Sequence, residues 1–146
     1  MRMSSLFPII KDLIPIVMPH SVHVTKTTAL DEATGQTEGM IRQGAIIGKS
    51  DKICASVMIA KPHTSSAVHH HGEQDTIIFA KSGHGTIISN DGKTRQELSP
   101  GDFALIPAWT EHQEANEGDE EVVWIITRSG GSPVVVNLEG WGGRMK

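Results

Sequence analysis

The sequence "SSAVHHHGEQDTIIFAKSGHG", residues 65–85, places three consecutive histidines ahead of an apolar run and a glycine turn. In an extended strand, alternate side chains point to the same side, so His69 and His71 are expected to face one point while His70 faces away. Neutral imidazole is a common ligand of zinc, iron, nickel and copper. A His-x-His pair also occurs by chance in polar loops, so a metal site needs support from a second segment.

That second segment is "PAWTEHQEAN", residues 107–116, in which a polar stretch follows a proline turn. The same alternation predicts His112, Glu114 and Asn116 on one face of a strand. Three histidines from two strands would cap one face of an octahedral metal and leave positions open for a substrate or for oxygen. Open positions are what a catalytic metal needs, because a closed four-ligand site is usually structural.

Short runs rich in valine, isoleucine and threonine alternate with turn residues from about residue 50 onward. Asparagine, aspartate and glycine in the gaps suit tight hairpin turns, and this spacing is typical of an all-β sandwich or barrel. Strands are predicted at residues 53–61, 76–81, 85–89, 94–98, 102–107, 111–116, 121–128 and 133–138. Before them, "SVHVTKTTA" (21–29) is predicted as a strand and "LDEATGQTEG" (30–39) as a loop or a short helical turn.

The 146 residues suit a single domain. We divide it into an N-terminal arm with the first strands (1–49), a β-barrel core (50–138) and a C-terminal tail (139–146). The formal net charge of -4 argues against nucleic acid or an anionic membrane as a partner, because both reward a basic face. The single cysteine, Cys54, cannot form an internal disulfide and lies in an apolar run.

The N-terminal stretch "LFPIIKDLIPIVMP", residues 6–19, is apolar enough to suggest a signal peptide or a membrane helix. Lys11 and Asp12 interrupt it, and its prolines break any helix. It has no small-residue cleavage site and falls short of the ~20 apolar residues that span a bilayer. We therefore expect a cytoplasmic protein whose arm packs on the domain or on a partner subunit, with a lid over a pocket as the alternative.

The two histidine segments together resemble the paired motifs of the cupin superfamily. The first motif is matched by His69, His71 and Gly83 around "GEQDTIIFAKS", and the second by Gly101, Pro107, His112 and Asn116. Trp109 stands where the family has glycine. The resemblance covers roughly residues 50 to 137 and is similar to the small single-domain cupins. It implies a jelly-roll β-barrel, metal ligands at the three histidines His69, His71 and His112, and a homodimer.

The chain departs from the family pattern at the acidic ligand of the first motif. Thr76 stands where the family usually has glutamate, and a threonine hydroxyl is a poor ligand for a divalent ion. The site therefore holds either three histidines alone or a fourth ligand from Gln74, Asp75 or Glu114. Pirin-like cupins use a glutamate at the offset that Glu114 has from His112. Three-histidine sites resemble those of cupin dioxygenases that cleave diketones or thiols.

Apolar residues near the predicted metal are expected to line a substrate pocket. The candidates for substrate binding are Met58, Phe79, Phe103 and Trp109, and the alternative for each is an ordinary core position. An indole at Trp109 would narrow the mouth or stack on a flat substrate. The chain has no tyrosine, which excludes a phenol as the general acid. Glu73, Asp75 and Glu114 remain as acid–base candidates, and Glu114 is the predicted catalytic residue for proton transfer.

These patterns predict a metal-dependent enzyme that acts on a small enolisable or phenolic molecule. Neutral histidine ligands leave a divalent metal its full charge, which favours anionic chelators such as enolates, catecholates or carboxylates. Iron, zinc, nickel and manganese all accept imidazole, so the sequence does not identify the metal. Dioxygenase chemistry is the first hypothesis, and zinc-dependent lyase, decarboxylase, isomerase or cyclase chemistry is the second. A barrel that binds a small ligand without converting it is the alternative to an enzyme.

Overall fold

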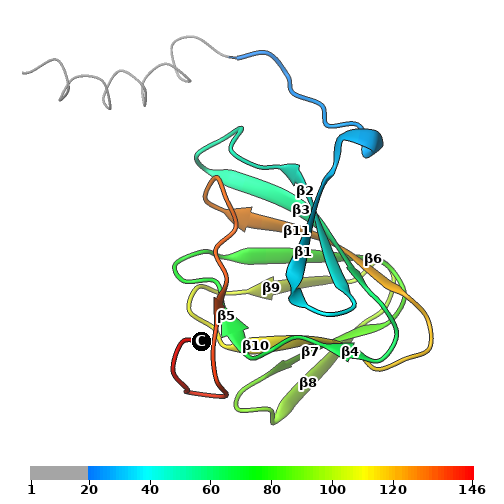
Figure 1. Ribbon diagram of the computed structural model, residues 1–146, viewed down its shortest axis with the longest axis vertical. Coiled ribbons are helices and arrows are strands. Elements are labelled where there is room, and N and C mark those ends of the chain that lie inside the picture. The colour runs from blue at the N-terminus through cyan, green and yellow to red at the C-terminus, as the bar shows by residue number, and fades with distance from the viewer. Residues whose placement is uncertain (1–19) are drawn as a thin grey trace, which may run out of the picture.

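The structure, a computed structural model, describes residues 20–146 and consists of two antiparallel β-sheets that face each other (Figure 1). The strands are β1 (Asp31–Thr37), β2 (Met40–Ile46), β3 (Ile53–Ala60), β4 (Thr64–Ser65), β5 (His69–His70), β6 (Thr76–Ser82), β7 (Gly85–Ser89), β8 (Thr94–Leu98), β9 (Phe103–Ile106), β10 (His112–Asn116), β11 (Val122–Ser129) and β12 (Val136–Asn137). One 3-10 turn, η1 (Thr27–Ala29), precedes them. The predicted all-β class is confirmed. Within residues 20–146, no helix is long and apolar enough to cross a membrane.

Strands distant in the sequence are neighbours in both sheets. The first sheet has the order β1-β2-β3-β11-β6-β9, and the second has the order β12-β5-β10-β7-β8, with β4 pairing with β10. β11 therefore lies between β3 and β6, and β10 lies between β5 and β7. This crossing of strands between two facing sheets is the jelly-roll arrangement.

The strands predicted from residue 53 onward are all present, and the last is shortened to β12. Two predictions before residue 50 are wrong. Residues 21–29 form an extended segment that ends in η1, and much of the predicted loop at 30–39 is β1. The cause is backbone pairing: β1 pairs with β2 across a turn that uses the positive φ of Gly39, so its polar composition does not prevent a strand. The arm predicted at the N-terminus falls largely on residues 1–19, outside the described residues.

Alternate residues of β3, β6 and β11 face the inside of the barrel and form its core. Trp124 lies at the centre of this core and is 0% exposed. Gly85 is required beside it, because a Cβ atom there would lie 2.5 Å from Cζ2 of Trp124. The core cluster comprises Met40, Met58, Ala60, Ile78, Ala80, Ile87, Leu98, Ile106, Val122, Trp124 and Ile126.

The outward faces of the two sheets differ in polarity. On the first sheet, one row that crosses four strands consists of Val57, Ile125, Phe79 and Phe103. Beside this row, Ile77 and Leu105 are 49% and 64% exposed. On the second sheet, β8 turns the charged side chains of Arg95 and Glu97 toward solvent. The outer face of the first sheet is therefore apolar in this region, whereas β8 gives the second sheet an ordinary polar outer face.

Candidate metal centre

Three histidines and one glutamate lie close together inside the barrel. His69 in β5 and His112 in β10 are directly opposite each other in the ladder, and His71 lies in the turn after β5. Glu114 follows two residues after His112 on the same inward face of β10. One ligand atom from each of the four residues lies within 4.8 Å of the others, and all four residues are buried. The structure thus brings the three predicted histidine ligands together with the predicted catalytic glutamate.

Backbone carbonyl groups orient all three imidazole rings. Nδ1 of His69, His71 and His112 lies 2.8, 2.8 and 2.9 Å from the carbonyl oxygens of Ala67, Val134 and Thr110, respectively. A carbonyl oxygen can only accept a hydrogen bond, so each Nδ1 carries the proton and donates it. Each Nε2 of a neutral ring then presents a lone pair to the interior, which is the arrangement that outer-shell hydrogen bonds impose on metal-binding histidines.

The Glu114 carboxylate completes the cluster as an anion. Its Oε2 lies 3.2 Å from Nε2 of His69, and its Oε1 lies 3.6 Å from Nε2 of His112. Nη2 of Arg42 lies 3.7 Å from Oε2 on the other side. Burial alone would raise the pKa of Glu114, but His69, His112 and Arg42 together lower this pKa well below its usual range. The group is therefore ionised.

The residues present fit a bound divalent cation. Nε2 of His69, Nε2 of His112 and Oε2 of Glu114 are buried and have no hydrogen-bond partner. Because each Nδ1 donates to a backbone carbonyl, each Nε2 is left to face the centre of the cluster beside the Glu114 carboxylate. Buried acceptors of this kind are costly unless they are satisfied, and a metal ion satisfies all of them at once. Nitrogen and carboxylate oxygen donors suit zinc, iron and manganese alike.

His71 is held in the neutral, ligating form at any ordinary pH. Burial, followed by the nearby charge of Arg128, lowers the pKa of His71 to about 2. Arg128 is itself buried inside the barrel, and its Nη2 lies 3.3 Å from Nε2 of His71. Burial and repulsion from Arg42 lower the pKa of Arg128 to about 10, so this guanidinium is still charged near neutral pH.

The other candidate ligands lie outside the cluster. Gln74, predicted as a possible metal ligand, donates its amide to the carbonyl oxygen of Ser132 and accepts from the backbone N–H of Val134, each at 2.8 Å. It therefore fixes the loop whose Val134 carbonyl orients His71. Asp75 accepts a hydrogen bond from the backbone N–H of Ala108 at 2.9 Å. The structure thus leaves Glu114 as the fourth donor beside the histidines.

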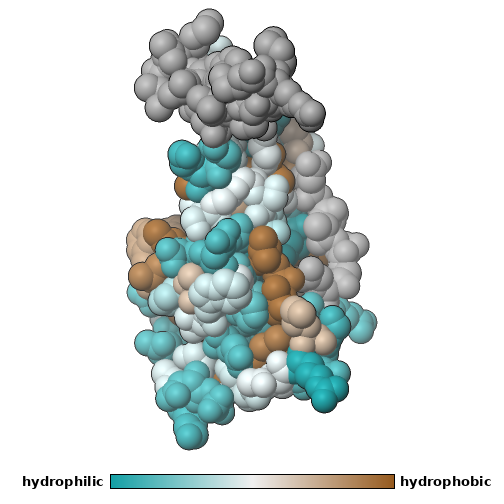
Figure 2. Space-filling view, turned by 90° about the vertical axis from the view of Figure 1, so that its left-hand side faces the viewer, coloured by the Kyte–Doolittle hydropathy of each residue, from teal (hydrophilic) through white to brown (hydrophobic). Residues whose placement is uncertain are grey.

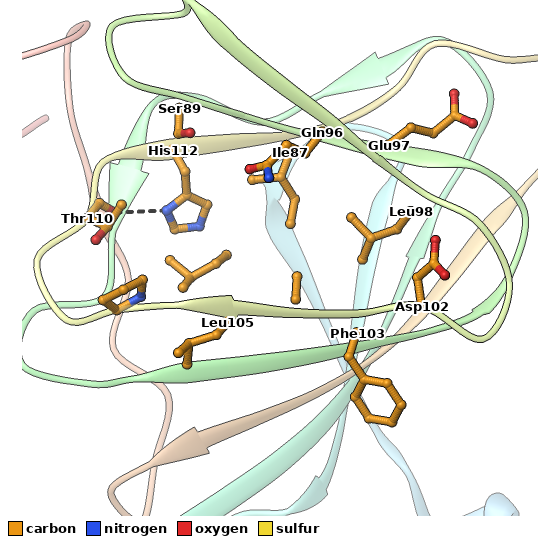
Figure 3. A pocket seen from close by; sticks show the side chains of 13 residues that line it. Ile87, Ser89, Gln96, Glu97, Leu98, Asp102, Phe103, Leu105, Thr110 and His112 are labelled. Carbon is orange, nitrogen blue, oxygen red and sulfur yellow. Dashed lines mark hydrogen bonds between the residues drawn. The ribbon is translucent and has the colours of Figure 1, made fainter.

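A cavity of about 530 Å³ leads to the cluster from the side of the barrel, between β7 and β8 on one sheet and β9 on the other (Figure 3). His112 lies at its inner end, and the side chains of Ile87, Leu98 and Ile106 form an apolar wall. At the end of the barrel where β11 ends, the surface carries a narrow band of hydrophobic residues between hydrophilic ones (Figure 2). Of the four cluster residues, His112 lines the lateral cavity.

The structure does not gather the predicted substrate-binding residues around the cluster. Met58 is 1% exposed and belongs to the core. Phe103 borders the cavity, but it is 72% exposed and its ring points away from the cavity (Figure 3). Phe79 stacks beside Phe103 on the outer face, at a centroid distance of 4.9 Å. Trp109 is 66% exposed, lies 5.6 Å from His70 between ring centroids, and has the positive φ of 64° that a glycine would adopt without strain.

Arg42 and Arg128 are the residues near the site that sequence reasoning missed. Arg128 occupies an inward position of β11, where the buried residues before it in the alternation are Val122, Trp124 and Ile126. An arginine at a position that the alternation of apolar residues assigns to the interior can be recognised from the sequence alone. Arg42 carries no such signal, because β2 has no clear alternation of buried and exposed residues.

Comparison with known proteins assigns the family. A family model described as "Cupin domain" matches residues 56–128, half of the chain, and the chain therefore belongs to the cupin family. The predicted cupin jelly roll is confirmed. The chain is also 35% identical over 69 residues to β-conglycinin β subunit 1 of Glycine max, a match that covers 46% of this chain and 16% of that protein.

Solved structures with the same fold include several enzymes. The polyketide cyclase RemF from Streptomyces resistomycificus matches with a TM-score of 0.65 at 18% identity, over 82% of this chain and 85% of its own. KdgF from Halomonas sp. matches with a TM-score of 0.63 at 21% identity, over 75% of this chain and 94% of its own. The oxalate decarboxylase of Lactobacillus farciminis matches with a TM-score of 0.67 at 19% identity, over 78% of this chain and 35% of its own. At these identities the likeness establishes the shared fold.

Proposed function

We propose that this cupin is a metal-dependent enzyme that acts on a small enolisable or phenolic molecule in its anionic form. The observation that carries this proposal is the set of unpartnered acceptors on His69, His112 and Glu114, which face one another inside the barrel. His71 supplies a third neutral nitrogen beside them.

A divalent metal bound by the three histidines would supply Lewis acidity or, if it is redox-active, activation of dioxygen. Glu114 is the residue for proton transfer, because its carboxylate is ionised, buried and close to the ligand atoms. Arg42 holds that carboxylate in place from the opposite side. The lateral cavity, whose lining includes His112, is large enough to admit a small molecule.

Two reaction types are compatible with this site. Three neutral ligands with open positions favour dioxygenase chemistry, in which the substrate and oxygen occupy neighbouring positions. The ionised Glu114 favours a non-redox reaction, in which the enzyme moves a proton on an enolate without oxygen. Cupins with the same fold include a polyketide cyclase and an oxalate decarboxylase, which supports the non-redox reaction.

Metal analysis tests the proposal. We expect protein purified without a histidine tag to hold close to one metal ion per chain by plasma mass spectrometry. His112→Ala should lose it, whereas His84→Ala, on an exposed turn, should retain it. Iron would be followed by oxygen uptake with diketones and catechols, and zinc by assays of decarboxylation and isomerisation. Equal metal content in His112→Ala and His84→Ala would contradict the site.

We also propose that a second copy of the chain covers the apolar outer face of the first sheet. The exposed side chains of Ile77, Phe103 and Leu105 are uncharged, so two copies related by a twofold axis would meet without like-charge repulsion. Light scattering should give a dimer that the double substitution Phe103→Ser and Leu105→Ser converts to a monomer. Thr86→Ser, on the second sheet, should leave the dimer intact. A monomeric wild type would overturn this proposal.

A further inference from the structure

Arg128 is a buried cation that points at the metal centre. It is 3% exposed, and β11 aligns it with Thr76 of β6 and Cys54 of β3 on the inner face of the first sheet. Its Nε donates to Oγ1 of Thr76 at 3.2 Å, and its Nη2 donates to Nε2 of His71 at 3.3 Å. The guanidinium and the hydroxyl of Thr76 thus stand together where the family pattern would place an acidic ligand.

We infer that Arg128 binds a carboxylate group of the substrate beside the histidine cluster, an inference that rests on the proposed function. The substrate class that follows is a small carboxylate with a second oxygen next to it, such as a 2-oxo acid, a 2-hydroxy acid or a short dicarboxylate. The carboxylate of the substrate would bind the guanidinium of Arg128. The second substrate oxygen, next to that carboxylate, would face the cluster of His69, His71, His112 and Glu114.

The first argument is charge. Glu114 is paired with Arg42 at 3.7 Å and with the histidine nitrogens. Its charge acts on Arg128 from further away, and among the side chains that the structure describes (20–30 and 37–146) no carboxylate lies within ion-pair distance of Arg128. A buried arginine without a counterion is rare, because removing a cation from water costs several kcal/mol. The single negative charge of Glu114 stands against the positive charges of Arg42 and Arg128, which leaves one positive charge over. A bound divalent metal would increase that excess, and an anionic substrate would neutralise it.

The second argument is hydrogen bonding. Nδ1 of His71 donates to Val134, so its Nε2 offers a single lone pair. That lone pair now accepts from Nη2 of Arg128, and it cannot do so while it binds a metal. The donor of Arg128 therefore needs another acceptor whenever the site is loaded. An oxygen anion within reach of the same ligand atoms is the acceptor that the geometry leaves open.

The third argument is the shape of the donor and its surroundings. A guanidinium presents parallel donors that match a planar carboxylate better than a tetrahedral anion. The inner row that contains Arg128 and Thr76 continues into Ile106, which lines the lateral cavity beside Leu98. A carboxylate at Arg128 would therefore direct an apolar remainder toward the cavity wall.

Calorimetry with oxalate as the probe tests the inference. We expect zinc-loaded Arg128→Met to bind oxalate about ten- to a hundredfold more weakly than the wild type, the effect typical of a lost hydrogen bond to a charged group. Arg128→Lys, which keeps the charge but loses the fork, should lie between them. The matched control Arg95→Met removes an exposed arginine that pairs with Glu117, and it should bind like the wild type. Affinity of Arg128→Met within twofold of the wild type, or tighter binding of inorganic phosphate than of oxalate, would overturn the inference.

Zinc content, measured on the same samples, separates this inference from the proposed function. Arg128→Met is expected to retain zinc, because Arg128 is not a ligand. If the wild type holds neither zinc nor another divalent metal, the proposed metal enzyme is wrong, and oxalate binding to the metal-free proteins decides the role of Arg128. In that case, weaker binding by Arg128→Met would support the arginine site, and no binding by the wild type would refute it. Circular dichroism of each variant shows that the comparison is made between folded proteins.

Discussion

The interior of the barrel has two halves of opposite character, built on the same strands. In one half, Ile78 of β6 and Trp124 of β11 belong to an apolar core and are 1% and 0% exposed. In the other half, Thr76 and Arg128 occupy inward positions of the same two strands and face the histidine cluster. The change from core to site takes one step of the alternation on each strand, from Ile78 to Thr76 on β6 and from Ile126 to Arg128 on β11.

The difference shows how one sheet can serve stability and function at once. Burial of apolar side chains stabilises the fold by about 25 cal/mol per Å² of surface removed from water. The polar half has the opposite effect, because His69, His112 and Glu114 carry buried atoms without partners. We therefore expect substitutions in the apolar half to act on folding and substitutions in the polar half to act on ligand binding.

The largest effect is expected in the apolar half. Trp124→Ala should lower the free energy of unfolding by about 3–5 kcal/mol, because it leaves a cavity in a close-packed core. Urea unfolding of the metal-free protein, followed by circular dichroism, measures the loss. Trp109→Ala is the matched control, since Trp109 is 66% exposed and its replacement should cost far less. Similar losses in both variants would break the distinction between the two halves.

Metal binding should stabilise the protein through the polar half alone. Zinc at about a hundred times its dissociation constant is expected to raise the free energy of unfolding by about 2.7 kcal/mol. His69→Ala should abolish this increase because it removes a ligand, whereas Trp124→Ala should retain it if the protein is still folded. Thermal scans with and without zinc give the comparison. An undiminished zinc effect in His69→Ala would contradict the assignment of this ligand.

The pH dependence of the metal-free protein should report on His71. Its pKa is lowered to about 2 in the folded state from an ordinary value of 6.5, so below about pH 6.5 the unfolded chain binds a proton that the folded chain does not. The stability that depends on neutral His71 is therefore complete above pH 6.5 and is lost as the pH falls, by about 1.4 kcal/mol per unit. Glu114 adds to the loss only below its unfolded value of about 4.3.

Urea unfolding at pH 7 and pH 5 measures this loss of stability. Between these values the free energy of unfolding of the wild type should fall by about 2 kcal/mol. His71→Gln, which cannot be protonated, should remove most of that difference. A wild type and a variant with the same pH dependence would show that His71 titrates normally in the folded protein.

The smallest effect is expected at the rim of the polar half, where Trp109 adopts a φ of 64°. Trp109→Gly should relieve the strain of a left-handed conformation and stabilise the protein by less than about 1 kcal/mol, because the greater freedom of glycine in the unfolded chain offsets part of the gain. Trp109→Ala keeps a Cβ atom and should give no such increase. Thermal unfolding of the three proteins is the measurement, and a destabilised Trp109→Gly would indicate that the indole makes a contact worth more than the strain.

Sequence reasoning succeeded where the signal was local and periodic. The alternation around His69, His71 and His112 predicted their convergence. The runs of β-branched residues and the turns between them predicted β3 and β6 to β12, but not the two-residue strands β4 and β5. It failed for β1, whose polar residues form a strand only because β2 pairs with them. It also failed for Phe79 and Phe103, because an apolar strand gives no indication of which of its two faces meets the other sheet.

The sequence by itself therefore determined most of the β-strands, the cupin motifs and which three histidines converge, since these follow from side-chain period and spacing along one chain. Only the tertiary structure decided what surrounds them. It placed Glu114 rather than Gln74 beside the histidines, directed Arg128 at His71, and opened the lateral cavity between β8 and β9. The physical reason is that these contacts join strands that are neighbours in space but distant in the chain, so their geometry depends on how the two sheets face each other.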